Sequence, residues 1–279
     1  MQTWFITGIS SGLGRAMAEH LLALGNNVAG TVRDVAAVAD LRAEFGNALW
    51  TEVLDVTDRR AIAPAVDAAF AHFGQIEVVV NNAGYGLFGA LEGLTHQQIR
   101  HQIDTNLIGP IEVAKAVLPH LRAQGGGRII AISSYGGQAV HAGASIYHAS
   151  KWGLEGFFEA LAQEVHGFGI GVTIVEPGAA RTGFRAAAAT HLGSVHDAYK
   201  DSPLARLGDV LSDQARTPGG DPAKMATAIV ASATVKPAPL RLILGSDAQS
   251  FMEQAVAIRL AAIKSQSSTA GMTDIVSDG

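Results

Sequence analysis

The stretch TGISSGLG, residues 7–14, decides the fold. It follows a run of strand-forming residues, 3–7, and opens a stretch whose apolar residues recur at helical spacing up to residue 24. Glycines let a backbone approach a phosphate closely, and a helix N-terminus offers free N–H groups and the positive end of a dipole. The spacing Gly-x-x-x-Gly-x-Gly differs from the Gly-x-Gly-x-x-Gly of the common dinucleotide fold. The stretch therefore predicts a pyrophosphate-binding turn, the alternative being a turn that only joins strand to helix.

Outward from this turn, short apolar runs alternate with stretches of helical period. Strands are predicted at 3–7, 28–32, 49–54, 76–80, 128–132, 170–175 and 240–244. Helices are predicted at 13–24, 62–73, 95–121 with a kink or break at Pro110, 147–165, from 222 behind an N-cap at Asp221, and 251–263. This alternation predicts an α/β fold, a doubly wound parallel sheet with helices on both faces. We expect one domain, 1–264, in which 179–217 forms a loop or lid over the site, followed by a polar, flexible tail, 265–279.

Composition excludes several classes of function. The 279 residues are 48% hydrophobic and 16% charged, with a net charge of −5 and no cysteine. Disulfide scaffolds, cysteine-ligated zinc and thiol catalysis are thereby excluded. The lack of a basic run argues against nucleic-acid binding, and no apolar stretch approaches the ~20 residues that span a bilayer. A strand that starts at residue 3 leaves no room for a signal peptide, so we expect a cytoplasmic protein.

The chain resembles the short-chain dehydrogenase/reductase family, in its compact single-domain branch and especially its steroid- and retinol-dehydrogenase-like bacterial members. The resemblance covers about 3–244 and rests on the turn Thr-Gly-x-x-x-Gly-x-Gly and on Asn-Asn-Ala-Gly at 81–84. It implies a Rossmann-type sheet of seven strands in the order 3-2-1-4-5-6-7 and a nicotinamide cofactor. It also implies a homodimer or homotetramer that pairs through the helix near Asn106 and the helix that carries Lys151. The cofactor-binding residues it implies are Gly8, Ser10, Ser11, Gly12, Leu13, Gly14, Arg33, Asp55, Val56, Asn81, Ala83, Gly84, Tyr147, Lys151, Pro177, Gly178 and Thr182.

The end of the second strand selects between the two nicotinamide cofactors. A carboxylate there binds the ribose 2′-OH of NAD, whereas an arginine accommodates the 2′-phosphate of NADP. By the resemblance, Val32 holds the place of the NAD-selecting acid and Arg33 that of the NADP-selecting cation. Asp34 lies twenty residues after Gly14, about the interval of a ribose-binding acid, so NAD(H) stays open. We expect NADP(H) to be preferred.

Four residues form the predicted catalytic set: Tyr147, Lys151, Ser134 and Asn106. Tyr147 and Lys151 share one face of a helix because they are four residues apart. Ketone reduction needs a proton on oxygen, and a free phenol with a pKa of about 10 is a poor acid–base catalyst near neutrality. A nearby ammonium and a positive nicotinamide would lower that pKa. Ser134 would hold the substrate oxygen, and the family implies that Asn106 holds a water that links Lys151 to solvent.

The predicted substrate pocket is lined by three loops and is largely apolar. We expect Tyr85, Tyr135, His141 and Phe184 to contact substrate, a neutral carbonyl compound or alcohol. The ten histidines show no metal-ligand pattern, so we expect no metal. The sequence predicts an NADP(H)-dependent carbonyl reductase or alcohol dehydrogenase. The alternatives are an NAD(H)-dependent alcohol dehydrogenase of the same fold and a catalytically silent nucleotide-binding regulator.

Overall fold

The computed structural model describes residues 1–213 and 217–275, and within them a seven-stranded parallel sheet forms the centre. The strand order is β3-β2-β1-β4-β5-β6-β7, as predicted. The strands are β1 (Thr3–Thr7), β2 (Asn27–Val32), β3 (Leu49–Val53), β4 (Val78–Asn81), β5 (Gly127–Ile132), β6 (Ile170–Pro177) and β7 (Arg241–Leu244). β1, β4, β5 and β6 are buried along almost their whole length, which explains their continuous apolar sequences.

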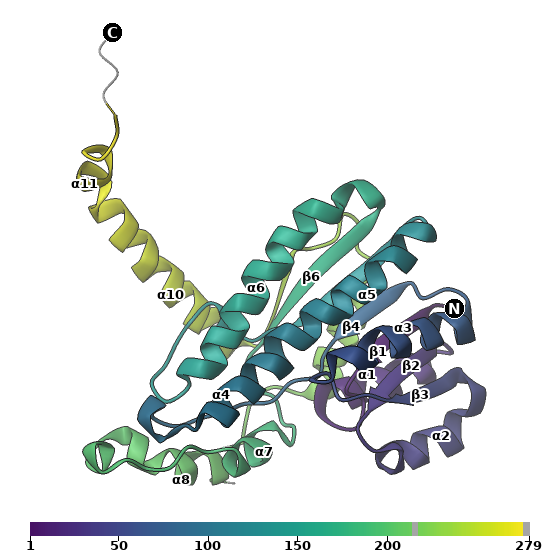
Figure 1. Cartoon of the computed structure of the whole chain (residues 1–279), viewed down its shortest axis with the longest axis horizontal. Helices are drawn as coiled ribbons and strands as arrows, with labels where there is room; N and C mark the ends of the chain where they lie inside the picture. Colours follow the sequence, from purple (N-terminus) through teal and green to yellow (C-terminus); the bar gives the residue numbers. More distant parts are fainter. Residues whose placement is uncertain (214–216, 276–279) are drawn as a thin grey trace.

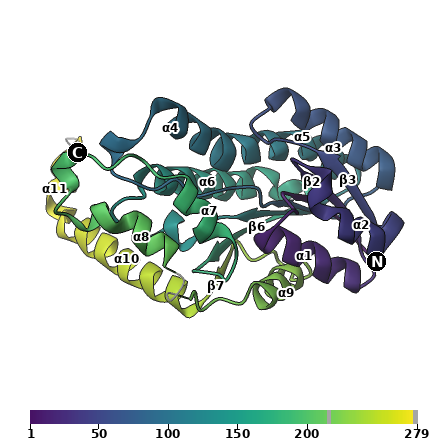
Figure 2. The ribbon, with the colours of Figure 1, turned by 90° about the horizontal axis from the view of Figure 1, so that it is seen from below.

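Helices cover both faces of the sheet (Figures 1 and 2). The helices are α1 (Gly12–Ala23), α2 (Ala39–Phe45), α3 (Arg59–Phe73), α4 (His96–Ile103), α5 (Gly109–Ala123), α6 (Ser145–Val165), α7 (Phe184–Thr190), α8 (Leu207–Ser212), α9 (Pro222–Ser232), α10 (Ser246–Ser265) and α11 (Ser267–Gly271). One apolar core joins the sheet to α3, α5 and α6, and a second joins it to α1, α2 and α9. The predicted doubly wound α/β architecture is confirmed.

The long helix predicted at 95–121 is interrupted. α4 ends at Ile103, a π-helical turn follows at Asp104–Ile108, and α5 begins at Gly109. Pro110 has no N–H to donate to the carbonyl of Asn106, so the regular helical bond is missing there. The prediction of a break at Pro110 is confirmed, and the break takes the form of a π turn just before the proline.

The region without clear period, 179–217, contains the helices α7 and α8, with residues 214–216 outside the described part. Sequence periodicity misses these helices because they are short. The isolated bridge between Phe88 and Leu192, with Ser194 N–H donating to the carbonyl of Gly93, fastens the segment to the chain after β4. The region is therefore fixed within its length by these contacts and at its start by the bridge between Ala180 and Gly220, and it is not an open loop.

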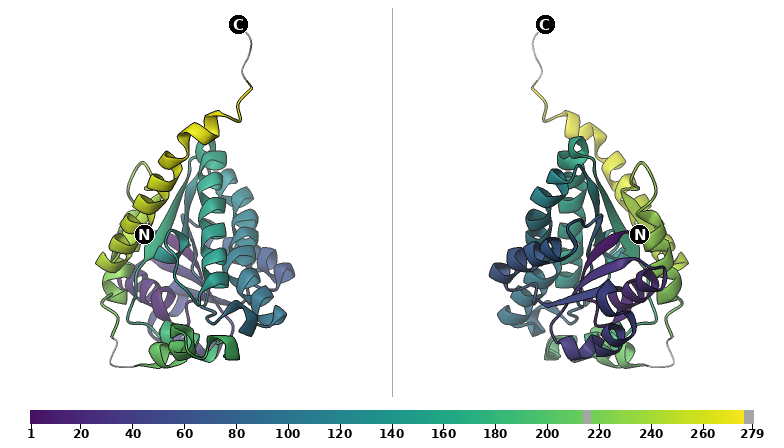
Figure 3. Two further views of the ribbon diagram at one scale, coloured as in Figure 1. Left: turned by 90° about the vertical axis from the view of Figure 1, so that its left-hand side faces the viewer. Right: turned by 90° about the vertical axis from the view of Figure 1, so that its right-hand side faces the viewer.

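The last helix is longer than predicted. α10 spans Ser246–Ser265 instead of 251–263, and α11 follows within the predicted tail, whose residues 276–279 lie outside the described part. In Figures 1 and 3, α10 runs along one flank of the molecule and extends past the sheet. Ala248 and Met252 near its start are buried, whereas Ile258 and Ile263 in its second half are exposed. The apolar packing of α10 on the body therefore lies in its first half, and in its second half Arg259 contacts Gln138 and the ring of Trp152.

Candidate active site

The glycine turn after β1 has the backbone that its sequence predicts. Gly8 and Gly12 have φ angles of +75° and +60°, in the left-handed region that favours glycine. A Cβ on Gly14 would lie 2.2 Å from the Gly8 carbonyl oxygen, so the helix and the turn touch backbone to backbone. Asn82 fastens the turn from β4, since its Nδ2 donates to the carbonyls of Thr7 and Gly8, both at 2.9 Å.

Two polar features around this turn remain open to a ligand. α1 begins after Ser11 with no side-chain cap and no acidic residue in its first turn, so its N-terminal N–H groups and dipole are available to an anion. Asn81, at the end of β4, is buried, and neither polar atom of its side chain has a hydrogen-bond partner within 1–213 and 217–275. Buried amides are normally paired. These residues fit a dinucleotide cofactor: the start of α1 would hold its pyrophosphate, and the Asn81 side chain would bind one of its polar groups.

The two residues after β2 that could select the cofactor, Arg33 and Asp34, differ in their contacts. The Asp34 carboxylate accepts from the backbone N–H of Ala36 at 2.9 Å and caps the 3₁₀ turn Val35–Val38. Arg33 is exposed, and no hydrogen bond or ion pair of its guanidinium occurs in the described residues. Among the described residues, the Asp34 carboxylate therefore has a hydrogen-bond partner, whereas the Arg33 guanidinium has none.

Asp55 and Val56 follow β3; Asp55 is exposed and hydrogen-bonded, whereas Val56 is buried in the core. Asp55 accepts from the N–H and the hydroxyl of Thr57 at 2.9 and 2.7 Å. Burial raises the pKa of Asp55, but the Thr57 bonds and the charge of Arg33 outweigh burial, so the pKa is lowered. Val56 is buried and packs against Gly109. A Cβ on Gly109 would lie 2.9 Å from the carbonyl oxygen of Val56. Of the pair, Asp55 keeps an exposed polar group at this edge.

Tyr147 and Ser134 come together at the carboxyl end of the sheet. Tyr147, in the first turn of α6, is 8% exposed, and Ser134 is the second residue after β5. Burial raises the pKa of Tyr147 to about 12, and a hydrogen bond with Ser134 acts in the opposite direction. In the chain by itself loss of hydration sets the direction of this shift, and the lowering of the pKa by Lys151 together with a nicotinamide stays a prediction. The neighbouring Ser133 donates from its Oγ to Glu155 at 2.8 Å.

Lys151 is buried one helical turn after Tyr147. Its Nζ donates to the carbonyl of Ile132 at 2.8 Å. Burial lowers the pKa of Lys151 to about 8, and the charge of Glu155 acts in the opposite direction. The two predicted catalytic side chains therefore lie on one face of α6, as their spacing indicates.

Asn106 uses its side chain to hold the chain after β4. Its Oδ1 accepts from the N–H of Tyr85 at 3.0 Å, and its Nδ2 donates to the carbonyl of Tyr85 at 2.9 Å. Gln102, one turn earlier, adds bonds to Leu87 and to the same carbonyl. Asn106 Nδ2 also lies 3.3 Å from Ser150 Oγ, next to Lys151 in sequence. The sequence missed Gln102, although its place four residues before Asn106 is a visible signal.

Pro177 is the last residue of β6, and Gly178 and Thr182 follow it, with Gly178 next to α10 and Thr182 next to the start of α1. Thr182 lies close to the glycine turn, since a Cβ on Gly12 would meet its Cβ at 3.8 Å. Asp247 in the first turn of α10 accepts from the N–H of Ala179 at 2.8 Å. The sequence missed Asp247 because it lies 68 residues further along the chain. These three predicted cofactor-binding residues therefore lie between the start of α1 and the start of α10.

Aromatic rings surround Tyr147. Its ring centroid lies 5.7 Å from that of Phe88 and 6.0 Å from that of Phe184. Of the other predicted substrate residues, His141 stacks at 6.5 Å on Phe88, and Tyr135 lies 5.3 Å from Phe251 of α10, which the sequence missed. The surroundings of the predicted catalytic tyrosine are largely apolar.

Tyr85 is the predicted substrate residue that lies apart from this group. Its ring packs between His101 and His191, with centroids at 5.3 and 5.0 Å. Burial raises its pKa to about 12.

His148 fixes the loop beside the site. Its Nε2 accepts from the backbone N–H of His141 at 3.1 Å, so its proton is on Nδ1, which donates to the carbonyl of Gly136 at 2.8 Å. Burial and the neighbouring His141 lower its pKa against the pull of the Gly136 carbonyl. His148 is therefore a neutral side chain that holds Gly136 and His141 together.

No group of three or more histidine, cysteine or acidic side chains arranged for a metal occurs in 1–213 and 217–275.

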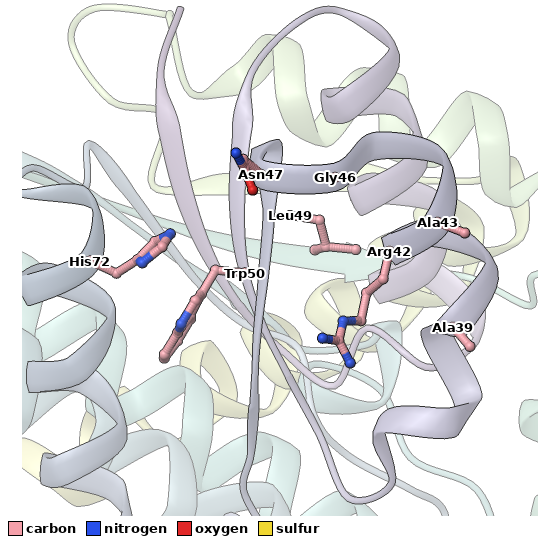
Figure 4. Close-up of a pocket in the computed structure, with 8 residues that line it drawn as sticks. All are labelled: Ala39, Arg42, Ala43, Gly46, Asn47, Leu49, Trp50 and His72. Carbon is pink, nitrogen blue, oxygen red and sulfur yellow. The ribbon is translucent and has the colours of Figure 1, made fainter.

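A cavity of about 490 Å³ lies elsewhere, at the edge strand β3. Figure 4 shows Trp50 and His72 on one side of the strand and Arg42 and Leu49 on the other, because side chains alternate along a strand. None of the predicted site residues lines it.

In the part of the chain that the structure describes, no helix is long and apolar enough to cross a membrane.

Sequence comparison decides the family. The family model described as short chain dehydrogenase matches residues 2–192. The chain belongs to the short-chain dehydrogenase/reductase family. The match contains Asn106, Ser134, Tyr147 and Lys151 and ends within the segment that carries α7 and α8. It leaves α9, β7 and α10 outside, so Asp247 and Phe251 are contributed by a part of this chain that the family model does not cover.

Relatives of this short-chain dehydrogenase cover most of its length. "Oxidoreductase BOA17" of Botryotinia fuckeliana is 38% identical over 91% of this chain and 93% of its own. The 3-ketodihydrosphingosine reductase of Bacteroides thetaiotaomicron is 37% identical over 88% of each chain. Human retinol dehydrogenase 8 is 37% identical over 66% of this chain and 60% of its own.

Solved structures agree with the fold along nearly the whole chain. A short-chain dehydrogenase from Streptomyces avermitilis has 36% identity and a TM-score of 0.88, covering 98% of this chain and all of its own. A serine dehydrogenase in complex with NADP+ has 27% identity and a TM-score of 0.74, covering 87% of this chain and 93% of its own. The chain is therefore an oxidoreductase of this family with a nucleotide-binding fold.

Proposed function

We propose that the protein is an NADP(H)-dependent carbonyl reductase or alcohol dehydrogenase that acts on a neutral, largely apolar substrate. The observation that carries the proposal is the meeting of Tyr147, Ser134 and Lys151 beside the open glycine turn. Aromatic rings and few charges around Tyr147 favour an apolar substrate. Relatives named for 3-ketodihydrosphingosine and retinol support the same class.

Each residue of the set has a chemical task in this proposal. The bound nicotinamide supplies or accepts the hydride. Ser134 donates a hydrogen bond to the substrate oxygen and holds it next to Tyr147. Tyr147 donates its phenolic proton to that oxygen during reduction and takes it back during oxidation. Lys151 carries the positive charge that favours the phenolate once its ammonium turns from the Ile132 carbonyl. Asn106 keeps the chain after β4 in place by its two bonds to Tyr85.

The choice of NADP(H) rests on Arg33. A free guanidinium binds a phosphate in two-pronged fashion, whereas the Asp34 carboxylate already caps a turn. NAD(H) is the alternative that a titration distinguishes. A cytoplasmic location and a homodimer or homotetramer belong to the proposal as well, on the family resemblance and the lack of cysteine.

The test is an assay of NADPH consumption with a panel of apolar ketones, for the wild type and for Tyr147→Phe. We expect turnover by the wild type and a loss of 100-fold or more, on the order of that for a removed acid–base group, in Tyr147→Phe. NADPH binding should be retained, because the phenyl ring keeps the contacts with Phe88 and Phe184. Binding without turnover in the wild type would instead favour the silent nucleotide-binding regulator.

A further inference from the structure

Glu155 is a buried carboxylate that the reaction proposed above does not use. It lies on α6 one turn after Lys151 and two turns after Tyr147, and it is 3% exposed. One carboxylate oxygen accepts from Ser133 Oγ at 2.8 Å, and the other accepts from Gln138 Nε2. Buried carboxylates with such bonds are held in a single geometry.

The two partners of Glu155 lie on either side of the turn that carries Ser134. Ser133 precedes Ser134 directly, and Gln138 follows the 3₁₀ turn Tyr135–Gly137. The carboxylate also packs on the backbone of this turn, since a Cβ on Gly137 would lie 2.2 Å from Glu155 Oε1. Glu155 therefore contacts the turn at its beginning, its end and its backbone.

Arg241 of β7 holds the carboxylate from the other side. Its guanidinium lies 3.6 Å from Glu155, 2.7 Å from Glu159 and 3.3 Å from Glu176. Glu159 is 47% exposed, whereas Glu176 is fully buried at the end of β6. Arg241 of β7 therefore links its strand to α6 through Glu155 and Glu159, and to β6 through Glu176.

We propose that Glu155 is a positioning residue of the reaction: it fixes the Ser134 turn through Ser133 and Gln138 and faces Lys151 with its negative charge. The inference rests on the proposed function. Glu155 touches neither the reacting atoms nor the predicted cofactor residues of the glycine turn, so it acts through Ser134 and Lys151.

The charge of Glu155 has a specific effect on Lys151. Burial lowers the pKa of Lys151, and Glu155 acts against burial and helps Lys151 to keep its proton. Without that charge Lys151 would lose its proton at a lower pH. The other charged or titratable groups packed around this pair are Tyr147 and Glu159 of α6, Glu176 of β6, Arg241 of β7, and Arg259 of α10, which reaches Gln138.

The experiment compares Glu155→Gln with Glu159→Gln. The two sites share α6 and Arg241, but among the residues that the structure describes Glu159 makes no hydrogen bond to the Ser134 turn. For Glu155→Gln we expect kcat with NADPH and a ketone to fall about tenfold, the scale of one lost bond to a charged group. The alkaline limb of the pH profile should move to lower pH, so that the defect grows as pH rises. Glu159→Gln should keep the wild-type kcat and profile.

Two further variants separate the two actions of Glu155. Ser133→Ala removes one anchor of the turn and should lower kcat without moving the pH profile. Glu155→Asp keeps the charge on a shorter side chain and should restore the profile but not kcat. These variants keep the test informative if Glu155→Gln fails to fold.

NADPH binding followed by fluorescence from pH 6 to 10 provides a readout that does not need turnover. In Glu155→Gln the affinity should match the wild type at pH 6 and decline at a lower pH than in the wild type, as Lys151 loses its charge. A Glu155→Gln enzyme with the kcat, pH profile and binding of Glu159→Gln overturns the inference. A wild type that binds NADPH but reduces no carbonyl overturns the proposed function, and the binding profiles then still decide on Glu155.

Discussion

Burial dominates the chemistry of Tyr147 and Lys151. Removal of both groups from water disfavours their charged forms, so the pKa of the tyrosine rises to about 12 and that of the lysine falls to about 8. Groups in this situation depend strongly on the few polar neighbours that touch them. That dependence is the reason we expect substitutions of Ser134 and Glu155 to change the reaction, although each makes only a small number of contacts.

At the same scale, Arg33 is the residue on which, in the proposed function, cofactor choice depends. We expect Arg33→Ala to weaken NADPH binding about tenfold, the scale of a charge-assisted hydrogen bond, and to leave NADH binding unchanged. Its exposed position makes a folding defect unexpected. Fluorescence titration with both cofactors measures the effect, and Arg42→Ala, another exposed cation from the neighbouring helix α2, is the control. Equal wild-type affinities for NADPH and NADH would contradict the NADP(H) assignment.

Among the elements, the π turn between α4 and α5 has the clearest consequence for the site. It lies directly after Gln102 and contains Asn106, and both side chains bind the backbone at Tyr85. A break in the helix is tolerated here because Pro110 already removes one backbone donor. The prediction of a helix across this region was correct in type, whereas the shape of the break follows from packing.

The start of α4 gives a prediction at this scale. Thr95 forms a capping box with Gln98, in which each side chain bonds the backbone of the other residue. Thr95→Ala should lower the free energy of unfolding by about 1 kcal/mol, whereas Thr95→Ser keeps the hydroxyl and should change it little. Urea denaturation measures both variants. Equal losses in the two would show that the cap does not stabilise the helix.

For the whole molecule, the buried network around Arg241 links stability to pH. Burial and the neighbouring Glu155 raise the pKa of Glu176 from 4.5 to about 8, against the attraction of Arg241. Between these values the unfolded chain has released the proton that the folded chain retains, so stability falls as pH rises. At about 1.4 kcal/mol for each pKa unit, the change is on the order of a few kcal/mol.

Replacement of Glu176 tests this linkage. Glu176→Gln carries no titrating proton, so its stability relative to the wild type should increase from pH 5 to pH 8. Thermal and urea unfolding across this range measure the difference. Glu159→Gln, whose carboxylate is 47% exposed, controls for the loss of one partner of Arg241. A constant difference between Glu176→Gln and the wild type across the range would contradict the linkage.

The sequence by itself determined the order of the strands and of the longer helices, the glycine turn and the pairing of Tyr147 with Lys151, whereas it did not predict the short helices α2, α7, α8 and α11. Each of these depends on spacing within a few residues, such as the glycines of 7–14 and the interval of four on one helix face, which local backbone geometry imposes. The boundaries of these elements differ from the predicted ones by at most five residues, because helix and strand ends depend on capping and packing.

The tertiary structure decided the contacts between residues far apart in the chain. Glu155 meets Ser133 across 22 residues and Arg241 across 86, while Asp247 reaches Ala179 across 68. Local spacing carries no information about such pairs, because they form only when β6, β7, α6 and α10 pack together and exclude water. Burial then sets which of these groups hold a charge, and so the polar support of the site follows from the fold as a whole.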